Sequence, residues 1–200
     1  MYFSNLLNHS GQEPAGLLNR RTPPGDDAPR SRGELPLLVL QAPTAAAAET
    51  HLAEIDPQAY RPFNLLVADR ERAWVAQNRE GRLALTRLEP GLHLLTNLDV
   101  NDPRCPRIAR SHREFDDAGG VFERDGDVAG FRRALAGVLS DHTTALDPRQ
   151  PDPLGALCVH LDAYGTRCSS LLLLGTDGRW QHWFADGPPC TARYEPAPVP

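Results

Sequence analysis

The fold is decided by residues 63–97, which read FNLLVADRERAWVAQNREGRLALTRLEPGLHLLTN. Short apolar runs in this stretch are separated by turn-forming segments that contain residues such as Asp69, Asn78 and Gly91. Runs of this length and spacing predict an antiparallel meander. The predicted strands cover residues 63–68, 73–77, 82–87 and 92–97.

The flanking sequence predicts helices on both sides of this meander and a second group of strands near the C-terminus. Thr44 suits the N-cap of a helix that reaches Ile55, and Asp127 that of a helix that reaches Leu139. The other predicted elements are a strand at 15–19, helices at 34–41 and 108–122, and strands at 156–160, 167–174 and 180–185, the last two joined by a turn at 176–178. Because strands and helices segregate instead of alternating, the sequence predicts a layered α+β fold with helices covering antiparallel sheets.

The chain of 200 residues is long enough for one domain with a sizeable core. We expect an irregular N-terminal segment over 1–34, an α+β domain over 35–195 and a proline-rich tail over 196–200.

The composition excludes several classes of function. The formal net charge is −5, and no basic tract is longer than two residues, which argues against nucleic-acid binding. All basic residues are arginines, so neither a Schiff-base lysine nor a P-loop lysine exists here. The apolar runs are far shorter than the roughly 20 residues of a membrane span, and no signal-peptide pattern opens the chain. We therefore expect a cytoplasmic protein.

The four cysteines lack any C-x-x-C pair. Cys158 and His160 share one face of a predicted strand, and together with Cys168 and Cys190 they offer soft ligands for zinc. The spacing does not match the usual zinc knuckles, so buried structural thiols are the favoured interpretation. No metal and no cofactor are expected.

Two side chains are candidates for binding a ligand. Asn97 ends a predicted strand, where its amide could donate to an oxyanion or simply stabilise a turn. Arg167 leads into an apolar strand, where it could bind a substrate carboxylate or pair with Asp99 or Asp162.

Four ordered blocks of the chain resemble one protein family. These are RSRGEL at 30–35, PFNLLV at 62–67, GLHLLTN at 91–97 and YGTRCSS at 164–170. In this order they resemble the NRDE family, also called the transport and Golgi organisation protein two family, over about residues 14 to 195.

The resemblance implies an αββα sandwich like that of N-terminal nucleophile hydrolases, in which a cysteine follows the initiator methionine. Here Tyr2 occupies that place, so we expect a chain that lacks the first strands and the nucleophile, and that self-associates. By motif position, Asn97 resembles an oxyanion donor and Arg167 a cleft arginine. The resemblance implies a non-catalytic binding or trafficking role for a small molecule of haem or acyl-lipid type. The alternative is a cysteine-dependent amide hydrolase whose start lies further upstream.

Overall fold

The computed structural model describes residues 6–7, 14–20, 28–144, 152 and 154–198. Tyr2 and most of the proline-rich connector at 147–153 therefore lie outside the described residues. The chain divides into two compact units. The first comprises residues 1–100, 174–180 and 199–200, and the second comprises residues 101–173 and 181–198.

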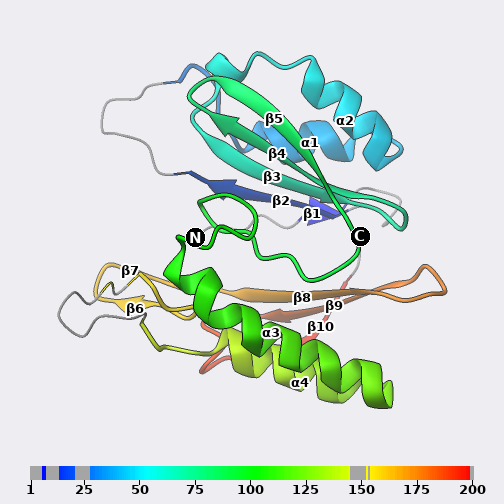
Figure 1. The fold of residues 1–200 in the computed structure, drawn as a ribbon, viewed down its shortest axis with the longest axis vertical. Helices are drawn as coiled ribbons and strands as arrows, with labels where there is room; N and C mark the ends of the chain where they lie inside the picture. Colours follow the sequence, from blue (N-terminus) through cyan, green and yellow to red (C-terminus); the bar gives the residue numbers. More distant parts are fainter. Residues whose placement is uncertain (1–5, 8–13, 21–27, 145–151, 153, 199–200) are drawn as a thin grey trace. The chain divides into compact units, whose positions relative to one another are not determined.

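The first unit is built on a five-stranded sheet in the order β1-β2-β3-β4-β5 (Figure 1). Every neighbouring pair is antiparallel. The strands are β1 (Leu6–Leu7), β2 (Pro14–Asn19), β3 (Phe63–Ala68), β4 (Ala73–Arg79) and β5 (Arg82–Leu88). Glu80 and Gly81 join β4 to β5 with φ values of 51° and 74°. Two successive positive φ values match the right-handed twist of the flanking strands, as in type I′ hairpin turns.

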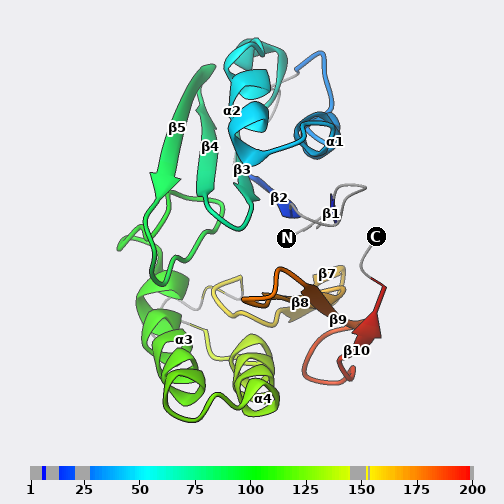
Figure 2. The same cartoon turned by 90° about the vertical axis from the view of Figure 1, so that its right-hand side faces the viewer.

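Two helices cover one face of this sheet, α1 (Glu34–Leu40) and α2 (Ala45–Ala53), as Figure 2 shows. Thr44 caps α2 as predicted, because its side chain accepts a hydrogen bond from the Ala47 N–H. A short 3-10 helix, η1 (Pro57–Ala59), leads into β3. The core between helices and sheet contains the fully buried side chains of Leu35, Val39, Leu52, Phe63 and Leu65.

The predicted strand at 92–97 is wrong. Residues 92–96 have no regular secondary structure, and Asn97 and Leu98 form a bend. The chain leaves β5 at Gly91, whose φ of 145° is rarely adopted by residues with a side chain. The Asn64 side-chain amide then donates hydrogen bonds to the carbonyls of Thr96 and Leu98. These backbone carbonyls are therefore paired with a side chain and not with a neighbouring strand.

The second unit contains two helices that lie side by side, α3 (Pro106–Asp125) and α4 (Val128–Leu139) (Figures 1 and 2). Gly126 ends α3 in the left-handed conformation (φ 63°), and Asp127 is the N-cap of α4 without a side-chain capping hydrogen bond. Phe122 and Phe131 stack between the helices with ring centroids 5.5 Å apart. The predicted α4 bounds are confirmed, whereas α3 is longer than the predicted 108–122.

Five strands complete the second unit. They are β6 (His160–Leu161), β7 (Tyr164–Gly165), β8 (Ser169–Leu174), β9 (Trp180–Ala185) and β10 (Glu195–Ala197). β6 and β7 form a small hairpin, and the other three form a sheet in the order β10-β9-β8. Arg132 of α4 stacks on the Trp183 ring of β9 at 4.5 Å, which packs the helix against this sheet. β10 includes two residues of the predicted tail.

The strand predicted at 156–160 is also wrong for most of its length, since residues 155–158 are bends. The Cys158 N–H donates to the Asp141 carbonyl just after α4 instead of joining a sheet. β8 likewise begins two residues later than predicted and leaves Arg167 in a loop. Four α-helices and antiparallel sheets within the described residues confirm the α+β class. None of the described helices is long and apolar enough to cross a membrane.

Candidate functional site

Asn97 is held in place by the residues on either side of it. The Asn64 amide donates to the Thr96 carbonyl at 2.8 Å and to the Leu98 carbonyl at 2.6 Å. Asn64 is fully buried on β3, so this clamp fixes the bend against the end of the sheet. Asn97 is itself half-buried, and its side chain has no hydrogen bond to any described residue. The clamp therefore fixes the backbone that carries this amide.

The charged side chains around this clamp form one network centred on Asp99. Arg20 donates to Asn64 Oδ1 at 3.0 Å and to Asp99 Oδ1 at 2.9 Å. Arg79 lies 2.8 Å from the same Asp99 oxygen, and Gln77 donates to it at 3.3 Å. These contacts tie the segment that follows β5 to β4 and to the end of β2.

Arg167 is an exposed residue between β7 and β8 in the second unit. Arg167 forms no ion pair with Asp162 or with another described residue of the second unit. Asp99 itself pairs with Arg20 and Arg79 in the first unit. The guanidinium is therefore available to an anionic ligand. That Asn97 and Arg167 converge on one ligand stays a prediction.

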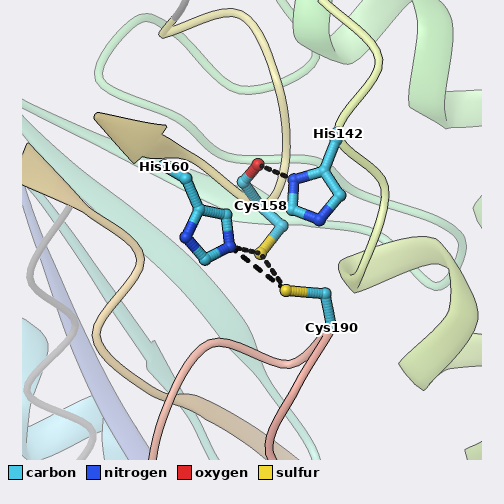
Figure 3. A group of neighbouring side chains, drawn as sticks. All are labelled: His142, Cys158, His160 and Cys190. Carbon is cyan, nitrogen blue, oxygen red and sulfur yellow. Dashed lines mark hydrogen bonds between the residues drawn. The ribbon is translucent and has the colours of Figure 1, made fainter. Parts of the chain in front are cut away.

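A cluster that the sequence indicates only in part lies in the second unit and consists of His142, Cys158, His160 and Cys190 (Figure 3). Each residue offers one ligand atom, and these four atoms lie within 4.8 Å of one another. The Cys158 Sγ lies 3.7 Å from both the Cys190 Sγ and the His160 Nε2. His160 Nε2 is 3.1 Å from Cys190 Sγ, so three atoms form a compact triangle.

Hydrogen bonds outside the cluster hold its segments together. The Cys158 N–H donates to the Asp141 carbonyl at 2.9 Å, and the Ser140 hydroxyl donates to the Pro189 carbonyl at 3.0 Å. Although burial alone raises the pKa of Asp141, hydrogen bonds from Thr143 and Arg110 lower it below its usual value. The ionised Asp141 thus anchors the turn that carries His142.

The two thiols of the cluster are not bonded to each other. Their separation of 3.7 Å is well beyond the roughly 2.05 Å of a disulfide. Burial and the neighbouring Cys190 raise the pKa of Cys158 to about 11, so the thiol stays protonated at neutral pH in the absence of a cation. Such thiols are poor nucleophiles, because the thiolate is the reactive form.

The sequence indicates three members of this cluster as possible metal ligands, Cys158, His160 and Cys190, although buried structural thiols are its favoured interpretation. Cys168, the fourth candidate ligand in the sequence, is exposed and lies outside the cluster. His142 is not predicted, because its only signal is a position just after the C-cap of α4. The expectation of buried thiols holds for Cys105 and Cys158, whereas Cys190 is exposed like Cys168.

The two units define an α+β protein with helices packed on antiparallel sheets. The family model described as Transport and Golgi organisation 2 matches residues 7–183. The chain therefore belongs to the Transport and Golgi organisation 2 family, as its four sequence blocks indicated. No curated protein matches the chain.

Proposed function

We propose that this family member binds a small molecule of haem or acyl-lipid type and serves to carry it. The observation that supports this role most strongly is the Asn97 amide, which has no hydrogen bond to another described residue although the Asn64 clamp holds the backbone on both sides of it. Because that backbone is already fixed, binding a ligand there costs less conformational freedom than ordering a mobile loop.

Asn97 and Arg167 suit the polar ends of both ligand types. An amide N–H donates to a carbonyl or carboxylate oxygen, and a guanidinium binds a carboxylate through two parallel hydrogen bonds. Haem carries carboxylates and an acyl lipid carries a carbonyl or carboxylate group, in each case on a large apolar body. The cytoplasmic location expected from the sequence agrees with a carrier of such poorly soluble molecules.

The proposed role is binding rather than hydrolysis. Asn97 and Arg167 can stabilise negative charge on a bound oxygen, but neither is a nucleophile or a general base. We therefore assign these two side chains to binding and not to acyl transfer.

Ligand titration of two variants tests the proposal. Haem and a long-chain acyl thioester are titrated separately into the wild-type protein, N97A and R167Q. Losing a hydrogen bond to a charged group costs about 1.5–3 kcal/mol, which corresponds to roughly 10- to 100-fold in affinity. We expect each variant to lose about this much affinity for a ligand whose carboxylate its own side chain contacts, and each variant is judged by itself.

Two exposed residues outside the site give matched controls. Q181A removes a side-chain amide, as N97A does, and R113Q removes a guanidinium group, as R167Q does. Both controls should bind like the wild type. The proposal fails if neither ligand binds, or if haem binding is lost in H160Q and unchanged in N97A. Cleavage of an amide substrate would instead support the alternative of a cysteine-dependent hydrolase.

A further inference from the structure

The cluster of His142, Cys158, His160 and Cys190 has the dimensions of a tetrahedral metal site. Zinc bonds of about 2.3 Å to sulfur and about 2.0–2.1 Å to nitrogen place two sulfurs about 3.8 Å apart and a sulfur and a nitrogen about 3.6 Å apart. The corresponding separations are 3.7 Å for the two sulfurs, and 3.7 Å and 3.1 Å for His160 Nε2 to each sulfur. Three corners of a tetrahedron are thus already in place.

His142 supplies the fourth corner. The His142 Nδ1 lies 2.9 Å from the Cys158 carbonyl oxygen (Figure 3). Because a carbonyl oxygen can only accept a hydrogen bond, Nδ1 is the ring nitrogen that carries the proton, and the lone pair of Nε2 is left to bind a metal. A backbone carbonyl bound to one ring nitrogen commonly orients a histidine whose other nitrogen binds a metal. Since all four ligand atoms lie within 4.8 Å of one another, closing the site requires changes of only about 1 Å.

The charges of the cluster also fit a divalent cation. Two thiolates and two neutral imidazoles carry two negative charges, which one divalent ion neutralises completely. Without a cation, two thiolates 3.7 Å apart would repel each other, and burial of Cys158 disfavours its charge. A bound cation reverses this preference, because a coordinating thiol is deprotonated outright.

Groups other than the four ligand atoms also hold the segments of the cluster together. The Ser140 hydroxyl lies 2.7 Å from the Ala136 carbonyl within α4 and 3.0 Å from the Pro189 carbonyl, which is next to Cys190. The Thr166 hydroxyl accepts from the Val159 N–H at 3.0 Å, and the Thr166 N–H donates to the Val159 carbonyl, so the β6–β7 hairpin is fixed beside Cys158. This arrangement lowers the ordering cost of binding an ion.

We propose that His142, Cys158, His160 and Cys190 bind one Zn²⁺ ion, which cross-links the segments 140–143, 158–160 and 188–192. Two thiolates and two imidazoles in tetrahedral order are the ligand set that zinc prefers. Four protein ligands leave no open position, so the ion is structural rather than catalytic. Binding releases the two thiol protons to solvent. The inference is independent of the proposed ligand site, which uses none of these four residues.

Cobalt spectroscopy of the full chain tests this site. After removal of metals with a chelator under reducing conditions, Co²⁺ is titrated into the protein at pH 7. We expect one Co²⁺ per chain, the intense visible bands of tetrahedral cobalt, and near-ultraviolet charge-transfer bands from thiolates. Zn²⁺ should displace the cobalt, and about two protons should be released per ion in a weakly buffered solution with a pH indicator.

Variants of exposed ligands show whether these residues form the site. C190S and H160Q should each lower the affinity by more than about 100-fold, because even loss of a supporting group costs 10- to 100-fold. The matched controls are C168S and H112Q, exposed residues outside the cluster, and they should bind like the wild type. Circular dichroism verifies that each variant is folded. Octahedral cobalt spectra, or tetrahedral bands that survive in C190S and H160Q, would overturn the proposal.

Discussion

Replacing Asn64 with alanine is expected to lower the free energy of unfolding by about 2–4 kcal/mol, because a fully buried side chain loses three hydrogen bonds that are each worth about 0.5–1.5 kcal/mol. These are the bonds that Asn64 donates to the Thr96 and Leu98 carbonyls and the bond that it accepts from Arg20. Equilibrium denaturation in urea measures the change. The variant should also weaken ligand binding, since the bend that presents Asn97 loses its clamp.

Asn19→Ala is the matched control for this prediction. Asn19 ends the neighbouring strand β2 and is exposed, so its loss should change stability by no more than about 0.5 kcal/mol. Equal effects of the two substitutions would show that the Asn64 clamp does not hold the 96–98 segment. A loss of ligand affinity without a loss of stability would place Asn64 itself in contact with the ligand.

Zinc is expected to raise the melting temperature of the wild-type protein by roughly 8–16 °C at a free concentration of about 1,000 times its dissociation constant. Binding to the folded state alone contributes about 4.1 kcal/mol at that concentration. In a chain of this size, each kcal/mol shifts the melting temperature by about 2–4 °C. Differential scanning calorimetry with and without Zn²⁺ measures the shift.

The same comparison in C190S and C168S separates a specific site from general metal binding. C190S should lose the zinc-dependent shift, whereas C168S should keep it, because only Cys190 belongs to the cluster. A shift that is equal in both variants would assign the effect to other side chains. A decrease in melting temperature on adding zinc would mean that the ion prefers the unfolded chain.

Local sequence patterns were enough to predict most of the fold. The strands β3 to β5 follow from short apolar runs and their turns, and the bounds of α4 follow from an amphipathic pattern that begins after Asp127. The failures at 92–97 and 156–160 have a common cause. In both places a distant group binds the backbone, Asn64 in the first and the Asp141 carbonyl in the second. Contacts of this kind leave no periodic signal in the sequence.

The candidate sites were predictable to different degrees. Asn97 and Arg167 could be selected because they fall in motifs of the family, and the structure leaves both side chains without a partner among the described residues. The metal cluster joins His142, Cys158 and Cys190, which are separated by 16 and 32 residues. No short zinc motif spans such distances, and only the folded turns after α4 and β9 bring these ligands together.

The most direct test of the proposed function is a crystal structure of the protein with a bound long-chain acyl ligand. We expect Asn97 Nδ2 to donate to the ligand carbonyl at about 2.7–3.2 Å. The proposal is contradicted if the ligand touches neither Asn97 nor Arg167.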